Sequence, residues 1–341
     1  MKIFLLLLLA YAVVQCKSVN KDRQLPEPVT NNAVVALQKN GRPVIYSFFG
    51  LNSAKNQRGV HNKTFKVDVA TGKSSSVRAV PDEFGRLASS ASVIRNRAYI
   101  AGGYAVMPNG KERSSNNIYC FNPDDESFTE GASMPIVIDD HVQGVWRDSL
   151  LYVVSGWSDS LNVNVVQIYN PLNDSWKLAT SLPDEPGAKK FGGCGLIAGD
   201  TIYVLGGATF ARFYPPSHSF YKGAINPQDA TKIRWIKGND YPGEFRYRSV
   251  AFHGGGIICF FGGSNETYNY NGISYAEKKP VEPNATMLLY NIALGTFEIK
   301  SSSIRLMDLR NAAIINSNFY IAGGMRTHQQ VSKEIIKINF P

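Results

Sequence analysis

The sequence has few of the features that mark membrane, metal or nucleic-acid proteins. After an apolar run at Ile3–Val14, no stretch of the 341 residues is long and apolar enough for a membrane-spanning helix. The four cysteines form no CxxC pair and the five histidines are scattered, so neither zinc nor redox chemistry is expected. The basic residues are dispersed in spite of a formal net charge of +9, which argues against nucleic-acid binding. We therefore expect no cofactor, no metal and no nucleic-acid partner.

Helical periodicity is also missing, whereas glycine and aromatic residues are abundant. The chain has 30 glycines, 17 tyrosines and 18 phenylalanines, a composition that favours an all-β protein. The apolar run follows Lys2 and is too short to span a bilayer, as in a secretory signal peptide. We expect a signal over residues 1–16 and a single secreted or periplasmic domain over residues 17–341. Cys16 leaves open a lipid anchor, although Gln15 differs from the small residue that precedes the cysteine in bacterial lipoproteins.

An apolar run ending in glycine recurs six times along the chain. The second residues of these doublets are spaced by 53, 53, 51, 56 and 61 residues, and they are Gly50, Gly103, Gly156, Gly207, Gly263 and Gly324. A period of this size is typical of propeller blades, each a sheet of four short strands. Glycine permits backbone angles closed to other residues and lets neighbouring strands approach closely. The repeat therefore predicts a six-bladed β-propeller.

The second repeat contains all the parts of such a blade. Strands are expected at 89–94, 98–103 and 117–121, and a fourth opens at Phe128 after an Asn-Pro-Asp-Asp turn. The pattern resembles the Kelch repeat, which has a glycine doublet, an aromatic residue in the third strand and a tryptophan in the fourth. Aromatic pairs match these positions at Tyr119 and Phe128, Tyr169 and Trp176, and Tyr290 and Phe297, and Trp235 fits the fourth strand of another repeat.

The two ends of the chain predict how the ring closes. Repeats end on a short signature around proline, and Leu25-Pro26-Glu27-Pro28 carries it with no blade before it. The last repeat stops at its third strand, 334–340. The N-terminal segment should therefore supply the outer strand of the last blade and cover an open sheet edge.

Charged residues stand where loops enter the innermost strands, at the expected mouth of the central channel. The basic and acidic members of this set are Arg86, Asp139, Asp140, His141, Lys190, Arg246, Arg248, Asp308 and Arg310. We expect Asp140, His141, Arg246 and Arg310 to face one shared cavity. Two interpretations remain open: the charges pair across blades and stabilise the ring, or they bind a ligand, with Arg86, Lys190, Arg246, Arg248, Asp308 and Arg310 as the binding residues.

A narrower resemblance is to the secreted N-acetylneuraminate epimerases, also called sialic-acid mutarotases. It rests on the signal, the early Leu-Pro-Glu, the six repeats and the insertion at 268–279, which has a Tyr-Asn-Gly-containing stretch. In the fourth repeat Ala208 stands where the family has an acidic residue, and Arg212 follows. The resemblance implies acid–base chemistry by Asp140 and His141, with Arg212 beside them. We expect a binding module for a carbohydrate or protein ligand or, alternatively, a mutarotase or epimerase of an acidic sugar.

Overall fold

A computed structural model describes residues 23–338, which form six antiparallel sheets. We number these sheets as blades 1 to 6 in chain order. Blades 1 to 3 consist of the following strands: β1 Ala33–Lys39, β2 Arg42–Phe48, β3 Thr64–Asp68 and β4 Ser74–Val77; β5 Ser90–Ile94, β6 Arg97–Ala101, β9 Ile118–Asn122 and β10 Ser127–Glu130; β11 Val142–Trp146, β12 Leu150–Ser158, β13 Leu161–Asn170 and β14 Ser175–Ala179.

Blades 4 and 5 repeat this order, and blade 6 has three named strands. Their strands are β15 Cys194–Ala198, β16 Thr201–Leu205, β17 Phe220–Asn226 and β18 Asp229–Lys237; β19 Val250–Gly254, β20 Ile257–Phe261, β21 Thr286–Asn291 and β22 Thr296–Ser301; β23 Ala313–Ile315, β24 Asn318–Ala322 and β25 Ile335–Ile338. A small hairpin, β7 Tyr104–Val106 and β8 Glu112–Ser114, extends from blade 2. The only helical elements among the described residues are two 3₁₀ turns, η1 Gln57–Gly59 and η2 Thr327–Gln329.

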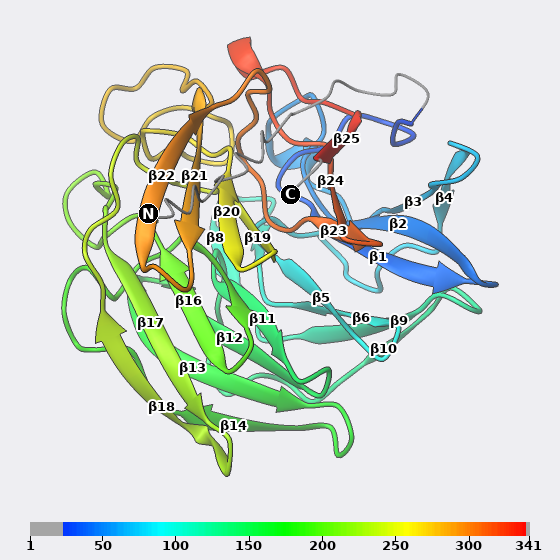
Figure 1. The fold of residues 1–341 in the computed structure, drawn as a ribbon. Helices are drawn as coiled ribbons and strands as arrows, with labels where there is room; N and C mark the ends of the chain where they lie inside the picture. Colours follow the sequence, from blue (N-terminus) through cyan, green and yellow to red (C-terminus); the bar gives the residue numbers. More distant parts are fainter. Residues whose placement is uncertain (1–22, 339–341) are drawn as a thin grey trace, which may run out of the picture.

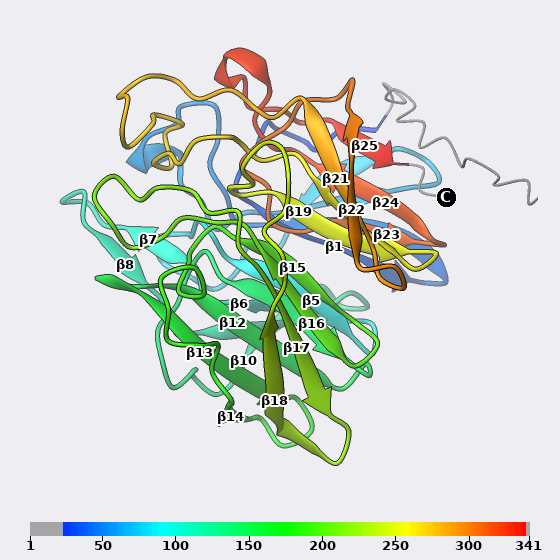
Figure 2. The ribbon, with the colours of Figure 1, turned by 60° about the vertical axis from the view of Figure 1, so that its left-hand side comes forward.

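The sheets are arranged around one axis as the blades of a propeller. Figure 1 shows β1, β5, β11, β19 and β23 nearest the centre, and Figure 2 shows β15 on the same inner side of blade 4. These innermost strands contact one another from blade to blade, as β1 does with β5 and β5 with β11. The expected all-β, six-bladed propeller is confirmed.

The core lies between the blades, and this explains the apolar runs. The second strands are covered on both faces, so nearly every residue of segments such as 44–48 and 98–101 is buried. Six hydrophobic clusters fill the six junctions between neighbouring blades. The outer strands are largely exposed, as in β4 and β10, and therefore carry polar residues.

The glycine doublets join neighbouring blades through the backbone. In five blades the amide of the second doublet residue donates to a carbonyl of the next blade, at 2.8 to 3.1 Å; the pairs are Gly50 to Arg86, Gly103 to Ile138, Gly207 to Arg246, Gly263 to Leu306 and Gly324 to Val29. A Cβ on the first glycine would meet that carbonyl oxygen at 2.4 Å at Gly262 and at 2.3 Å at Gly323. Blade 3 uses a side chain instead, because the Ser155 hydroxyl donates to the Lys190 carbonyl at 2.9 Å.

The chain's start lies against its end in blade 6, as expected. Gln24 forms an antiparallel bridge with Glu334, the Leu25 amide donates to the Lys333 carbonyl at 2.7 Å, and the Ile335 amide donates to the Arg23 carbonyl at 3.1 Å. The Leu25 side chain is buried in the cluster between blades 6 and 1. The expected signal at 1–16 and the possible anchor at Cys16 lie outside the described residues. Within 23–338 no helix is long and apolar enough to cross a membrane.

Candidate functional site at the channel mouth

Each loop that enters an innermost strand contains one residue in the left-handed backbone region. The φ angles lie between 48° and 62° in all six blades, at Asn31, Ala88, Asp140, Gly192, Arg248 and Asp308. In blades 1 to 5 this residue stands two positions before the strand. Four of the six are not glycine or asparagine, residue types that adopt this conformation at lower cost, so the surrounding structure must hold them in it.

These six residues form a closed ring of hydrogen bonds around the channel. The backbone links are Asn31 N to Asp308 O at 3.0 Å, Asp140 N to Ala88 O at 3.2 Å, Gly192 N to Asp140 O at 2.8 Å, Arg248 N to Gly192 O at 2.7 Å and Leu309 N to Arg248 O at 3.0 Å. The Asn31 side chain supplies the sixth link, because its Oδ1 accepts from the Ala88 amide at 2.7 Å. Every blade is thus connected to both neighbours at this level.

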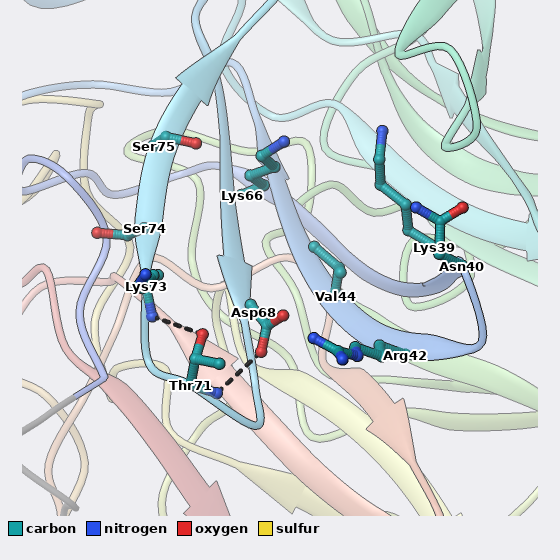
Figure 3. A pocket seen from close by; sticks show the side chains of 10 residues that line it. All are labelled: Lys39, Asn40, Arg42, Val44, Lys66, Asp68, Thr71, Lys73, Ser74 and Ser75. Carbon is teal, nitrogen blue, oxygen red and sulfur yellow. Dashed lines mark hydrogen bonds between the residues drawn. The ribbon is translucent and has the colours of Figure 1, made fainter.

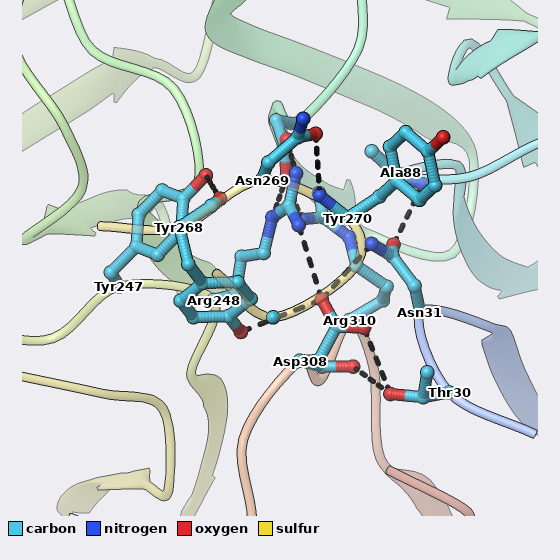
Figure 4. A network of polar contacts seen from close by, with 12 residues as sticks. Thr30, Asn31, Ala88, Tyr247, Arg248, Tyr268, Asn269, Tyr270, Asp308 and Arg310 are labelled. Carbon is cyan, nitrogen blue, oxygen red and sulfur yellow. Dashed lines mark hydrogen bonds and ion pairs between the residues drawn. The ribbon is translucent and has the colours of Figure 1, made fainter. Parts of the chain in front are cut away.

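Four buried charges, Asp140, Arg248, Asp308 and Arg310, fill the ring and pair with one another. Figure 4 shows Arg248, Asp308 and Arg310 of this network. Arg248 holds Asp140 through two contacts, Nε to Oδ1 at 3.1 Å and Nη2 to Oδ2 at 2.6 Å, and its Nη1 donates to Asp308 at 3.2 Å. Arg310 also donates to Asp140 and, at 3.3 Å, to the His141 carbonyl. The Arg248 guanidinium lies beside the paired rings of Tyr247 and Tyr268, 5.2 and 5.4 Å from their centroids.

Hydrogen bonds and arginines set the ionisation of the two buried carboxyls. Burial raises the pKa of Asp140, but Arg248 and Arg310 outweigh it and leave the pKa below its usual value. For Asp308 burial dominates and the pKa is raised, although Arg248 and the Thr30 hydroxyl, 2.9 Å from Oδ2, act in the opposite direction. Asp140 is therefore ionised and has no oxygen free for a ligand, since both of its oxygens accept hydrogen bonds from guanidinium groups.

A cavity of about 180 Å³ opens above this network. Its polar lining residues are Glu112, Asp139, Asp140, Asp159, Arg248 and Asn269, and its aromatic lining residues are Tyr104, Trp157, Phe191, Tyr214 and Tyr275. Ring contacts connect the aromatic wall: Trp157 to Tyr214 at 5.6 Å and Tyr214 to Tyr275 at 5.0 Å between centroids. This mouth cavity draws its lining from blades 2 to 5.

Asp139 is a buried acidic group of the mouth cavity that forms no ion pair with any of residues 23–338. Its Oδ2 accepts from the hydroxyl of Ser114, the last residue of β8 in the small β7–β8 hairpin, at 2.5 Å. Burial, and then the neighbouring charge of Asp140, raises the pKa of Asp139 well above its ordinary value. The side chain can therefore carry a proton that Asp140 cannot carry.

Three of the expected ligand-binding cations point away from the mouth cavity. Arg246 donates to the Thr286 carbonyl at 2.7 Å and to the Gly262 carbonyl at 3.3 Å, and Arg86 makes the equivalent contact with Gly102 at 3.1 Å and pairs with Asp82. Lys190 donates to the Ser219 hydroxyl at 2.7 Å, and burial lowers its pKa to about 7. The expectation that Arg246 shares the mouth with Asp140 is wrong. These residues stand two positions before the left-handed residue, and their side chains enter the space between blades.

The expected acid–base unit is not assembled either. The His141 side chain is buried, its Nε2 lies 3.1 Å from the Gln143 amide oxygen, and burial lowers its pKa to about 4. Arg212 lies in the exposed β16–β17 loop, stacked over Phe213 at 4.7 Å, and does not line the mouth cavity. Asp140, Arg248, Asp308 and Arg310 do come together, in the mutual pairing that the sequence left as one alternative.

The aromatic wall is the part of the site that the sequence reasoning missed. Trp157 directly follows the third doublet and Tyr275 lies in the blade 5 insertion, so their positions were signals in the sequence. Tyr214 had no comparable signal, since it follows six residues after the fourth doublet that fit no repeat. Within residues 23–338 no group of three His, Cys, Asp or Glu side chains is placed to hold a metal ion.

The fold and this mouth define the chain as a β-propeller of the binding-module type. The family model described as Kelch motif matches residues 85–135 and 148–183, and the propeller is of the Kelch type. Zebrafish (Danio rerio) Kelch-like protein 15 is 24% identical over 118 residues, which is 35% of this chain and 19% of that protein. Bos taurus Kelch-like protein 36 is 28% identical over 117 residues, 34% of this chain and 18% of that protein.

Two further similarities cover more of the chain. Kelch-like protein terF of Aspergillus terreus is 25% identical over 187 residues, 51% of this chain and 39% of that protein. A solved structure titled "Structure of YjhT" superposes with a TM-score of 0.73 at 15% identity and covers 93% of this chain and 96% of its own. That likeness shows the fold. The matches span about a fifth of the length of the two vertebrate proteins.

Proposed function

We propose that the chain is a recognition module whose mouth cavity receives a cationic group of a protein partner, such as a lysine or arginine side chain. The proposal rests on the charge that remains in the lining of the mouth cavity once the buried ion pairs have been counted. The two arginines of the network already face two aspartates, so no cation remains to attract an acidic ligand. The other ionisable lining groups are all acidic, namely Glu112, Asp139 and Asp159; because Asp139 can hold a proton, Glu112 and Asp159 are the carboxylates that can attract a cation.

The aromatic wall supports the same ligand. Cations bind favourably over aromatic faces, and a cage of such rings with nearby carboxylates is a recurring way to hold an ammonium or guanidinium group. Trp157, Tyr214 and Tyr275 line one continuous wall of the mouth cavity, and the exposed Asp159 stands at its rim. A side chain entering the cavity would also displace little structure, because the loops are held by the ring of hydrogen bonds.

Isothermal titration calorimetry with small probes tests this proposal. The probes are Nα-acetyl-lysine amide, Nα-acetyl-arginine amide, N-acetylglucosamine and N-acetylneuraminate. We expect the two cations to bind and Asp159→Asn to weaken them, whereas Asp240→Asn, the same change at an exposed aspartate that does not line the mouth cavity, leaves affinity unchanged. Preferential binding of the neutral sugar or of the acidic sugar would replace the protein partner by a carbohydrate.

Catalysis on an acidic sugar is a second candidate, which one observation favours. Asp139 lines the mouth cavity with a raised pKa, and a mutarotase needs a group that can donate a proton to the ring oxygen. One-dimensional NMR of freshly dissolved N-acetylneuraminate tests it: the protein should speed exchange between the anomers, and Asp139→Asn should abolish that effect. Line broadening without faster exchange would indicate binding alone.

We further propose that the chain is exported, with residues 1–16 as the signal and residues 17–341 as the mature protein. Support comes from the apolar run after Lys2 and from the position of Cys16 directly behind it. Fractionation of the source cells with the native sequence and with Cys16→Ala tests both parts. Release of the variant from the membrane fraction indicates a lipid anchor, and identical soluble fractions indicate plain secretion. Retention of both forms in the cytoplasm would contradict export.

A further inference from the structure

We propose a second ligand site on blade 1, a hollow that binds a small polyanion carrying two or more sulfate or phosphate groups. The hollow measures about 690 Å³ and lies between the β1–β2 turn and the β3–β4 turn (Figure 3). Strand β1 begins beside the ring of the channel mouth and ends at Lys39 in this hollow. The hollow therefore lies at the end of β1 that is remote from the ring, and it shares no lining residue with the mouth cavity.

Four cations of blade 1 line the hollow, one at the end of β1, one at the start of β2, one within β3 and one directly before β4. They are Lys39, Arg42, Lys66 and Lys73. Two carboxylates lie near them: Glu126 of blade 2, which accepts from Lys39 at 2.8 Å and Lys66 at 2.6 Å, and Asp68 in the lining. Burial raises the pKa of Glu126, but the two ammonium groups lower it overall, so the carboxylate is ionised. Two positive charges remain in excess.

Arg42 and Lys73 are the two lining cations that form no ion pair within residues 23–338. Both are exposed, and neither side chain makes an ion pair or hydrogen bond with residues 23–338. Asp68 is held in its turn, because its Oδ1 accepts the amides of Ala70 at 2.9 Å and Thr71 at 2.8 Å; Arg42 is near enough to lower the Asp68 pKa but forms no ion pair with it. In Figure 3 the ammonium groups of Lys39 and Lys66 end on one side of the hollow, away from Arg42 and Lys73. The cations thus form two groups, which suits a ligand with more than one anionic substituent.

The clustering of cations at this hollow destabilises the blade, whereas cations spread over the surface would not. Lys39 and Arg42 are direct cross-strand partners, and like charges opposite each other destabilise a sheet. Both turns that carry the cations are rigid. Asn40 and Gly41 in the β1–β2 turn have positive φ, as in a two-residue hairpin turn, and the hydrogen bonds to Asp68 fix the β3–β4 turn. A preorganised basic hollow with the hydroxyls of Ser74 and Ser75 beside it matches sulfate and phosphate oxygens.

Calorimetric titration of the whole protein with two polyanions tests the site and separates its possible ligands. The probes are sucrose octasulfate and inositol hexakisphosphate, with sucrose and inositol as uncharged counterparts. We expect at least one polyanion to bind and Arg42→Glu/Lys73→Glu to weaken it by about tenfold or more, since charge-assisted hydrogen bonds are lost. Binding of one probe alone identifies the sulfated or the phosphorylated class.

The control variant reverses two positive charges at another place on the protein surface. Lys232→Glu/Arg234→Glu changes two exposed cations of β18 in blade 4 and should leave affinity within about twofold, because it alters only the net charge. Equal weakening by both double variants would overturn the site in favour of unspecific attraction by a basic protein, and so would the absence of binding to the unchanged protein. Arg42→Gln/Lys73→Gln, which places no new charge, gives the same decision if the charge-reversal variant unfolds.

Discussion

At the scale of single residues, the charges of the ring of the channel mouth stabilise the fold before they serve any ligand. Asp140 is reached by arginines from blades 5 and 6, and Asp308 accepts from Thr30 and Asn31 of blade 1. One network of side chains therefore joins four blades, whose contributing residues are up to 278 positions apart in the sequence. Breaking a buried pair leaves an uncompensated charge in a medium that solvates it poorly.

Arg248→Met should therefore lower the free energy of unfolding by about 3 to 5 kcal/mol, because Asp308 then loses the arginine with which it forms an ion pair and Asp140 loses one of two. Urea denaturation measures this change. Arg212→Met is the matched control and should change stability by no more than about 0.5 kcal/mol, since Arg212 is exposed. If both variants were equally stable, the network would contribute nothing to the fold.

His141 makes stability depend on pH in a window that its pKa defines. The pKa is about 4 in the folded protein and about 6.5 in an unfolded chain, so between these values only the unfolded state takes up the proton. The contribution is fully present above pH 6.5 and is lost as pH falls toward 4. From pH 7 to pH 5 it amounts to about 2 kcal/mol of lost stability.

His141→Gln should reduce the loss of stability between pH 7 and pH 5 by that amount. Urea denaturation of both proteins at the two pH values measures it, and the comparison cancels the titration of every other group. His328→Gln changes an exposed histidine and should leave the loss unaltered. An unchanged pH dependence in the His141 variant would mean that the histidine titrates alike in both states.

At the scale of elements, the doublet strands were predictable because one physical demand recurs in every blade. A buried strand must end where the next blade's carbonyl approaches, and glycine lacks the Cβ that would block it. The directions of the loop side chains were not predictable. Moving two positions along a loop, from Arg246 to Arg248, turns the side chain from the space between blades into the channel, because Arg248 adopts a left-handed conformation that no residue type announces.

Gly262→Ala tests the role of the doublet in joining blades. The new Cβ would lie 2.4 Å from the Leu306 carbonyl oxygen, so blades 5 and 6 would have to separate locally, and we expect a loss of about 3 kcal/mol or more. Gly110→Ala is the control: its φ of +79° is similar, but nothing lies within 4 Å of its Cβ. That variant should lose only about 1 to 2 kcal/mol, the cost of the left-handed backbone itself. Equal losses in urea denaturation would leave backbone strain as the whole explanation.

At the scale of the whole molecule, the ring explains why the fold was predictable and the mouth was not. Six similar repeats each determine one blade, and the chain ends show how the circle closes. The mouth cavity instead combines the β7–β8 hairpin, the third doublet, a long loop in blade 4 and the insertion in blade 5. These segments differ between blades, so the periodicity carries no information about which of their side chains meet.

Closure itself can be tested by shortening the chain. A protein that begins at Glu27 lacks the Gln24–Glu334 bridge, both flanking backbone hydrogen bonds and the buried Leu25 side chain, all of which a protein beginning at Arg23 keeps. Burial of Leu25 contributes about 1.5 to 3 kcal/mol and each hydrogen bond about 0.5 to 1.5 kcal/mol, so the shorter protein should be less stable by about 3 kcal/mol. Urea unfolding followed by the fluorescence of the four tryptophans measures the difference.

Leu25→Ala in the longer protein separates the contribution of the side chain from that of the backbone and should account for about half to two thirds of the loss. The open edge of β25 should also promote association, seen as a larger species in size-exclusion chromatography. A shorter protein that is equally stable and monomeric would show that blade 6 closes the ring without the N-terminal segment.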